Sequence, residues 1–207
     1  MNQDEIFAKS EGDSWWLRNR AVLGTPEAVR DDPVLRLVFR NKVKPKTALE
    51  VGCANGWRLE ALRLETGAAC AGVDVSAAAI ADGRERFPAL DLRVGVASQL
   101  PVTGCFDLVV VYFVLHWVDR RTLLRSLAEI DERVANGGYL VVGDFAPPAP
   151  VAVPYHHREG VWTYHAQYAA SLVGLGFYDV VDGVSFEHIG GTWPSAAGCA
   201  LLKRRAQ

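Results

Sequence analysis

The sequence has no long apolar segment and no leader-like start. Its longest unbroken apolar run, residues 108–115, contains eight residues, whereas a membrane-spanning helix needs about 20. Residues 1–5 are polar and acidic, unlike the basic and then apolar start of a secretory signal peptide. We therefore expect a cytoplasmic protein without a membrane partner.

The sequence also lacks an excess of positive charge and any clustered cysteines. Its 207 residues carry 22 Lys and Arg against 24 Asp and Glu, a net charge of −2. Proteins that bind a nucleic-acid backbone usually show a basic excess, and the only run of three basic residues here is 203–205. The four cysteines form no CxxC pair, and no histidine lies at metal-ligand spacing. We expect reduced thiols, no metal ion and no nucleic-acid partner.

Internal repeats are missing as well, which excludes solenoids and propellers. Short apolar runs instead alternate with helical patterns along most of the chain. Strands are predicted at residues 47–51, 69–75, 92–96, 106–113 and 139–143, and helices at 57–64, 77–87 and 122–134, where Asn-Gly-Gly at 136–138 stops the last helix. Four strand–helix units in series predict right-handed crossovers and a doubly wound, mostly parallel α/β sheet.

Both ends of the chain are predicted to complete this fold. The residues before 42 look helical, with Val34, Leu35, Val38 and Phe39 on one face. The segment 146–155 holds four prolines and is predicted to be an extended loop. After it we expect a short helix at 163–175 and an antiparallel strand pair at 178–189 and 198–203.

The strongest motif lies between the first predicted strand and the first predicted helix. Its sequence, Glu-Val-Gly-Cys-Ala-Asn-Gly at residues 50–56, puts small residues at the carboxyl end of a strand, where doubly wound sheets bind ligands. It lacks the G-x-G-x-x-G spacing of dinucleotide folds. Asp74 ends the second strand 18 residues after Gly56. A carboxylate there can accept hydrogen bonds from both ribose hydroxyls; the alternative is a helix-capping aspartate.

The loop, the spacing and the acid together resemble the class I S-adenosylmethionine-dependent methyltransferases. Residues 95–98, 106–109 and 136–140 match further motifs of that family in order, so the resemblance covers roughly residues 47–203. It implies a Rossmann-like, seven-stranded sheet that is mostly parallel with an antiparallel C-terminal strand. The implied cofactor is S-adenosyl-L-methionine, which leaves as S-adenosyl-L-homocysteine.

The resemblance also assigns cofactor roles to individual residues. Asp74 would hold the ribose with Val75 beside the adenine, and Tyr112 would lie near the sulfonium. Ala54 departs from the glycine of many members and narrows the loop. The residues predicted to bind the cofactor are Glu50, Gly52, Cys53, Ala54, Gly56, Asp74, Val75, Ala97, Ser98 and Tyr112.

The exit of the fourth strand lacks the motifs that mark several classes of acceptor. It has no Asn/Asp-Pro-Pro-aromatic motif, no nucleophilic cysteine after a proline and no double-glutamate loop. The remaining acceptor is an oxygen or nitrogen of a small metabolite, and a loose resemblance to bacterial polysaccharide enzymes implies a sugar or nucleotide-sugar. The alternatives are a nicotinamide-dependent oxidoreductase and a non-catalytic S-adenosylmethionine-binding module.

Several residues are candidates for catalysis and substrate binding. His116 is either a general base, because the pKa of imidazole suits proton removal at neutral pH, or a structural residue against Trp117. The Tyr-His-His trio at 155–157 follows the segment where this fold builds an acceptor lid, and Asp144 is interpreted as a turn former. The predicted catalytic residues are His116, His156 and His157, and the predicted substrate and lid residues are Trp15, Trp16, Arg18, Arg20, Trp117 and Tyr155.

The N-terminal aromatic segment has two interpretations. Its tryptophans either cover the edge of the sheet, or the segment closes over the cofactor with Arg18 or Arg20 pairing a carboxylate. We expect one methyltransferase domain over residues 1–207, a monomer or homodimer. It would comprise a helical cap at 1–41, a cofactor-binding core at 42–145, and a lid loop, helix and strand pair at 146–207.

Overall fold

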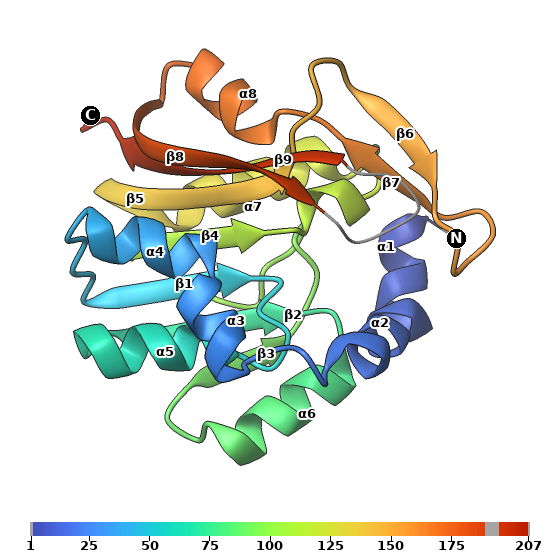
Figure 1. Cartoon of the computed structure of the whole chain (residues 1–207), viewed down its shortest axis with the longest axis horizontal. Coiled ribbons are helices and arrows are strands. Elements are labelled where there is room, and N and C mark those ends of the chain that lie inside the picture. Colours follow the sequence, from blue (N-terminus) through green and yellow to red (C-terminus); the bar gives the residue numbers. More distant parts are fainter. Residues whose placement is uncertain (1, 189–194, 207) are drawn as a thin grey trace.

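The computed structural model describes residues 2–188 and 195–206, which form a seven-stranded sheet covered by helices (Figure 1). Its strands are β1 (Thr47–Val51), β2 (Ala69–Asp74), β3 (Asp91–Val94), β4 (Phe106–Tyr112), β5 (Val134–Phe145), β8 (Tyr178–His188) and β9 (Ser195–Arg204). They are ordered β3-β2-β1-β4-β5-β9-β8. The pairs from β3 to β5 are parallel, and β9 runs antiparallel to both β5 and β8. The predicted doubly wound sheet is therefore confirmed; residue 189, predicted to end the strand that starts at 178, lies outside the described residues.

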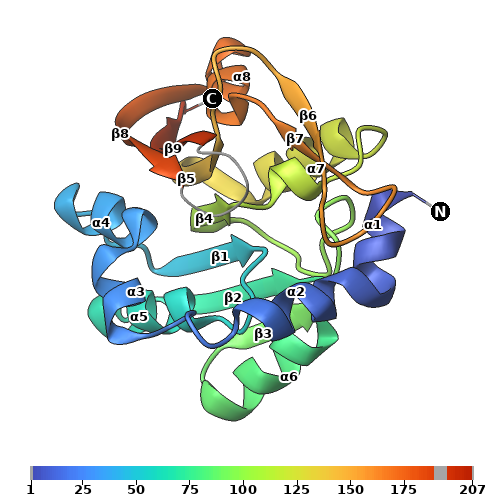
Figure 2. The same ribbon diagram turned by 45° about the vertical axis from the view of Figure 1, so that its right-hand side comes forward.

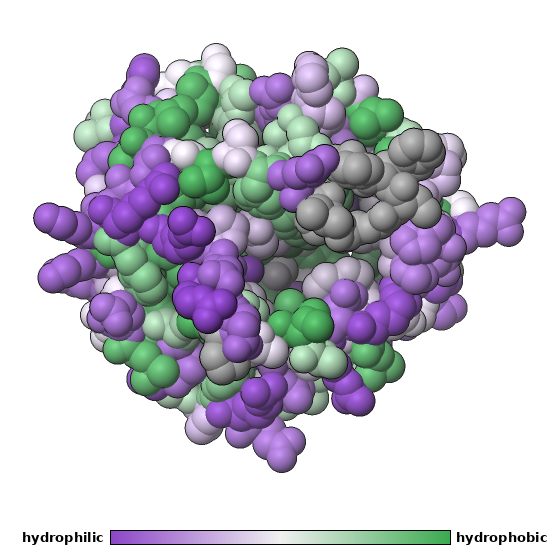
Figure 3. Space-filling view, viewed as in Figure 1, coloured by the Kyte–Doolittle hydropathy of each residue, from purple (hydrophilic) through white to green (hydrophobic). Residues whose placement is uncertain are grey.

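Helices pack on both faces because the central strands are apolar on both sides. Along β4, Leu108 and Val110 face one core, and Val109 and Val111 face the other. The first core receives α4 (Pro33–Arg40), α5 (Trp57–Thr66) and α6 (Ala77–Arg86); the second receives α7 (Leu123–Arg133) and α8 (Tyr168–Gly174). The outer surface over α4 and the adjoining α3 (Pro26–Asp31) is largely hydrophilic (Figure 3).

The prediction for the apolar face of α4 was wrong in one residue. Asp32 caps this helix by accepting a hydrogen bond from the Leu35 amide at 2.8 Å, and Pro33 follows as its first residue. Leu37 is buried, whereas Phe39 is 38% exposed. Leu37, together with Val34, Leu35 and Val38, forms the buried face of α4, and Phe39 lies at the edge of that face.

The segment after β5 also differs from the prediction. Residues 151–154 are not only an extended loop, because β6 (Val151–Pro154) pairs with β7 (Trp162–His165) in a second, two-stranded antiparallel sheet. The predicted helix at 163–175 was therefore wrong at its start, and α8 begins at Tyr168. A strand in a two-stranded sheet has a free edge, which tolerates a proline such as Pro154.

The sequence predicted the start of β5 too late, at residue 139. Residues 136–138 belong to β5, which begins at Val134 directly after α7. The backbone of Gly137 has a φ of +69°, and the pairing of β5 with β4 shifts between Phe106 and Leu108. The glycines thus form an irregularity inside the strand. Judged from the sequence alone, the same glycines indicated a turn between the helix and the strand.

The N-terminal segment crosses the end of the sheet where ligands bind in such folds. It comprises α1 (Gln3–Ile6), the π-helix η1 (Phe7–Glu11) and α2 (Gly12–Asn19). Figure 2 shows α1 and α2 next to the carboxyl ends of β1 and β2. Among the residues that the structure describes, no helix is long and apolar enough to cross a membrane.

Candidate active site

A cavity of about 340 Å³ lies at the carboxyl ends of β1, β2 and β4. This volume is in the range of small-molecule sites in proteins. The structure brings most of the predicted cofactor residues together there, namely Gly52, Cys53, Ala54, Asp74, Val75, Ala97 and Tyr112. Glu50, Gly56 and Ser98 do not line it. Of the predicted substrate and lid residues, Trp15 and Trp117 line it, and Trp16, Arg18, Arg20 and Tyr155 do not.

The loop after β1 closes tightly around the cavity. Gly52 has a φ of +77°, and a side-chain carbon at this position would lie 2.1 Å from the Val114 side chain. Ala54 also has a positive φ of +50°, a conformation that costs a non-glycine residue energy. Gly56 has a φ of +82° and precedes α5, so it sets the start of the helix rather than the cavity wall. The loop needs Gly52 for space and tolerates the small side chain of Ala54.

Asp74 fixes this loop to the start of the next helix. Its Oδ2 accepts a hydrogen bond from the Ala54 amide at 2.7 Å, and its Oδ1 accepts one from the Ser76 amide at 2.8 Å. Burial raises the pKa of the carboxyl group. The helix cap itself is Ser76, whose Oγ accepts from the Ala79 amide at 3.0 Å. Each Asp74 oxygen keeps further acceptor capacity for a ligand hydroxyl.

The N-terminal segment is bound to the cavity rim by polar contacts. Asp13 Oδ1 accepts hydrogen bonds from Ser76 Oγ at 2.7 Å and from the Ala78 amide at 3.0 Å. A side-chain carbon on Gly12 would lie 2.8 Å from Val75, so α2 approaches the rim closely. Trp15 of α2 lines the cavity. This segment therefore forms one wall of the cavity.

A second set of contacts joins this segment to the loop after β6. Arg18 Nη2 lies 2.6 Å from Glu11 Oε1 and donates to the Tyr155 hydroxyl at 2.6 Å. Burial raises the pKa of Tyr155 to about 12. The Tyr155 ring contacts the ring of Trp117, with centroids 4.6 Å apart. Arg20 is exposed.

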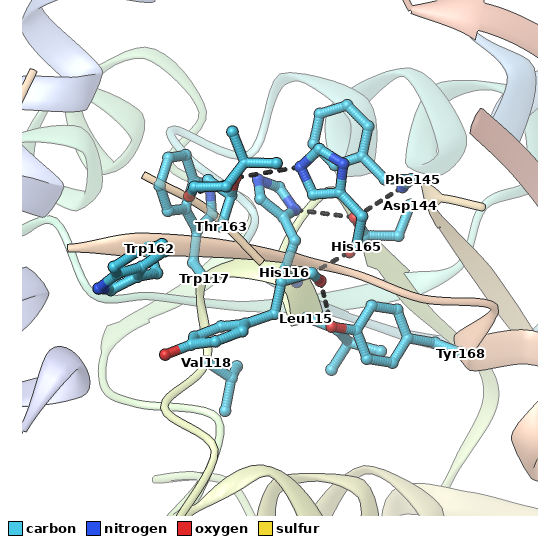
Figure 4. Close-up of polar contacts among 12 residues, drawn as sticks. Leu115, His116, Trp117, Val118, Asp144, Phe145, Trp162, Thr163, His165 and Tyr168 are labelled. Atoms are coloured by element: carbon cyan, nitrogen blue, oxygen red, sulfur yellow. Dashed lines mark hydrogen bonds and ion pairs between the residues drawn. The ribbon is translucent and has the colours of Figure 1, made fainter. Parts of the chain in front are cut away.

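His116 lies behind the cavity wall. Its Nδ1 is 2.8 Å from Asp144 Oδ1, and its backbone amide donates to Asp144 Oδ2 at 3.2 Å (Figure 4). Its ring packs between those of Trp117 and Phe145, with centroids 4.6 and 4.9 Å away. The interpretation of Asp144 as a turn former was wrong, because this residue is a buried partner of His116. His156 and His157 are exposed and do not line the cavity.

Several lining residues were missed from the sequence, and two of them have unusual surroundings or an unusual conformation. Phe113 follows β4 with a φ of +55°, an uncommon conformation for an aromatic residue. Arg58, in the first turn of α5, lines the cavity and forms ion pairs with Asp32 and Glu50. Nothing in the local sequence signals either feature. The motif acid Glu50 therefore acts through Arg58, since it is fully buried.

Solved structures share this architecture. N-methyltransferase NodS from Bradyrhizobium japonicum WM9, in complex with S-adenosyl-L-homocysteine, is 20% identical over 93% of this chain and 97% of that chain, with a TM-score of 0.65. The 1,6-didemethyltoxoflavin-N1-methyltransferase of Burkholderia thailandensis is 14% identical over 99% and 91%, with a TM-score of 0.75. CalS10, an amino pentose methyltransferase from Micromonospora echinaspora, is 16% identical over 92% and 95%, with a TM-score of 0.64. The fold is the Rossmann-like fold of these enzymes.

The sheet order, the glycine loop and the acid that ends β2 match those of the class I S-adenosylmethionine-dependent methyltransferases. Residues 49–142 match the family described as "Methyltransferase domain", so this part of the chain is similar to a methyltransferase domain. None of the curated protein sequences matches the chain.

The lining of the cavity fits the cofactor of this family. The backbone at Gly52 forms a cradle that a side chain would fill. Asp74 presents carboxylate oxygens for ribose hydroxyls, and Val75 and Ala97 offer apolar surfaces for a purine. S-adenosylmethionine is accordingly the cofactor.

Proposed function

We propose that this enzyme transfers the methyl group of S-adenosylmethionine to an oxygen or nitrogen of a small metabolite, such as a sugar or nucleotide-sugar. The observation that carries the proposal is the cavity in which the Gly52 backbone and the Asp74 carboxylate face a wall formed by α2. The similarity to CalS10, an amino pentose methyltransferase, supports a small sugar as acceptor, and the similarity to NodS, an N-methyltransferase, supports nitrogen as an acceptor atom. The enclosing N-terminal segment favours a small molecule over a macromolecular chain.

The bound cofactor supplies an electrophilic methyl group on a sulfonium. Asp74 would hold the ribose, with Val75 and Ala97 on the two sides of the adenine. Tyr112 and Phe113, at the exit of β4, would face the reacting end of the cavity. Because displacement at a methyl carbon depends on alignment, the main task of these residues is to hold donor and acceptor in line and keep water out.

The need for a base depends on the acceptor. A neutral amine attacks without prior loss of a proton, whereas a hydroxyl group requires a base. Among the predicted catalytic residues, His116 is nearest to the cavity wall, through its neighbours Phe113 and Trp117. We propose that His116 is a positioning residue for Trp117, and that His156 and His157 act at most as an outer part of the lid.

Isothermal titration calorimetry tests the cofactor, and a product screen tests the reaction. We expect binding of S-adenosylmethionine and S-adenosylhomocysteine but not of NADH. Incubation with S-adenosylmethionine and a panel of amines, sugars and nucleotide-sugars is expected to yield a product heavier by one CH₂ group in mass spectrometry. Binding of NADH alone would support an oxidoreductase. Cofactor binding without turnover of any acceptor would support a non-catalytic module.

A further inference from the structure

Arg58 occupies an unusual place between two carboxylates and two aromatic rings. Its guanidinium carbon lies 4.6 Å from the ring centroid of Trp57 and 4.9 Å from that of Tyr112. Its Nε lies 3.0 Å from Asp32 Oδ2, and its Nη1 pairs with Glu50 Oε1. The rings restrict its plane and the carboxylates restrict its rotation, so the guanidinium is held in one orientation.

These contacts leave one edge of the guanidinium unused. The two ion pairs occupy Nε and Nη1, and within the described part of the chain Nη2 has no hydrogen-bond partner. Arg58 is 8% exposed, and it is one of the residues that line the cavity. Nη2 is therefore a charged donor that is oriented beforehand and available to a ligand.

The charge around Arg58 complements the cofactor as a whole. Asp32 and Glu50 contribute two carboxylates against one guanidinium, and all three side chains are buried. S-adenosylmethionine carries one carboxylate, one ammonium and one sulfonium, a net charge of +1. The carboxyl groups of this site at least balance its one fixed cation, which suits such a molecule provided that the cation meets its carboxylate.

We infer that Arg58 binds the carboxylate of the amino-acid end of S-adenosylmethionine, and that Asp32 and Glu50 are positioning residues for it. This inference rests on the proposed function. The resemblance to the family places Gly52 and Cys53 at the same end of the cofactor, and both line the cavity together with Arg58. The role lies with Arg58 rather than with Arg18, whose guanidinium contacts Glu11 and Tyr155, or with the exposed Arg20.

A ligand that lacks only the carboxylate tests the inference. We would measure by calorimetry the affinities of S-adenosylmethionine and decarboxylated S-adenosylmethionine for the wild type and for Arg58→Lys. The wild type is expected to prefer the complete cofactor by about 10- to 100-fold, the range of a hydrogen bond to a charged group. The ammonium group of lysine cannot reproduce the fixed, planar arrangement of donors of a guanidinium, so Arg58→Lys is expected to lose most of this preference. Its affinity for the decarboxylated ligand is expected to change less than about threefold.

A second variant and a matched control complete the experiment. The double variant Glu50→Gln and Arg58→Met removes the cation together with one of its buried partners, and its binding of the decarboxylated ligand verifies that it is folded. Arg63 lies on the same helix as Arg58 and forms an ion pair with Glu60. The control variant Arg63→Met is expected to behave as the wild type. An unchanged preference in both Arg58 variants, or an equal loss for both ligands, would overturn the inference. A wild type that binds neither ligand would instead refute the proposed function.

Discussion

His116 Nδ1 lies 2.8 Å from Asp144 Oδ1, and both side chains are almost completely buried. Asp144 also accepts hydrogen bonds from the backbone amides of His116 and Phe145, at 3.2 and 2.8 Å. The carboxylate thereby joins the end of β5 to the segment after β4, from which Phe113 and Trp117 reach the cavity wall. Removing either partner leaves a buried polar group without its contact.

We expect His116→Gln to lower the free energy of unfolding by about 1–3 kcal/mol, the cost of an unsatisfied buried group. Turnover is expected to fall through misplacement of Trp117, without loss of an ionisation from the pH profile of kcat. Denaturant unfolding and a pH–rate profile measure the two effects. If the profile lost its acidic limb, the fall in kcat at low pH, in His116→Gln and kept it in Asp144→Asn, His116 would be the general base that the sequence suggested.

Asp74→Ala is expected to weaken binding of S-adenosylmethionine by about 1.5–3 kcal/mol, because the ribose would lose a charged acceptor. The Ala54 and Ser76 amides also lose their common partner, so the loop after β1 becomes less ordered. Calorimetry measures the change. Asp91→Ala is a matched control, because Asp91 is an exposed residue of the adjacent strand and pairs with Arg93. Equal affinities for Asp74→Ala and the wild type would refute the ribose assignment.

Gly52→Ala and Gly67→Ala separate backbone strain from steric overlap. Both glycines have nearly the same φ, +77° and +75°. A side-chain carbon added at Gly52 would lie 2.1 Å from the Val114 side chain, whereas one added at Gly67 would have no atom within 4 Å. We expect Gly67→Ala to cost about 1–2 kcal/mol of stability from the left-handed backbone alone. Gly52→Ala is expected to cost about 1–3 kcal/mol more and to weaken cofactor binding.

Unfolding curves and calorimetry on the two glycine variants check this expectation. The added substitution Val114→Ala is expected to restore part of the stability of Gly52→Ala, because it removes the carbon that the new methyl group meets. Equal losses of stability in Gly52→Ala and Gly67→Ala would show that the loop after β1 moves away from Val114 at no cost. Gly52 would then be needed only for its positive φ.

The parts of the fold that were predictable are those that a local pattern determines. The strands β1, β2 and β4 are mostly apolar runs, and β1 was predicted with its observed bounds at 47–51. The strands β6 and β7 were missed because each is stabilised by the other rather than by an apolar pattern, and prolines obscure β6. Phe39 was misplaced because Leu37, and not Phe39, completes the buried face of α4, a choice between two apolar residues that the local pattern does not determine.

The candidate site shows the same difference between features that a local pattern determines and features that depend on contacts distant in the sequence. The glycine loop and Asp74 were predictable because both lie within one short segment, residues 50–74, and their spacing can be compared directly with that of a known motif. The pairs Arg58–Asp32 and His116–Asp144 join residues 26 and 28 positions apart on different elements, so no local pattern contains them. The sequence therefore predicted the loop that lines the cavity but missed the residues that hold its neighbours in place.

The pKa of Glu50 gives the protein a pH dependence with a definite sign. Burial raises this pKa from 4.5 to about 7, against the attraction of Arg58. Between these two values the folded state holds a proton that the unfolded state has released, so the contribution of Glu50 to stability decreases as the pH rises from about 4.5 to 7. We expect the wild type to lose stability relative to Glu50→Gln across this window, and the difference to level off above it.

Glu60→Gln provides a control of the opposite sign. The hydrogen bond from Arg63 lowers the pKa of Glu60, so its stabilisation is lost as the pH falls through that lowered value. Denaturant unfolding of the wild type and the two variants at several pH values measures both effects. A stability difference between the wild type and Glu50→Gln that stayed constant from pH 4.5 to 7 would show that Glu50 remains ionised beside Arg58 throughout. The cavity would then keep the full surplus of negative charge at neutral pH.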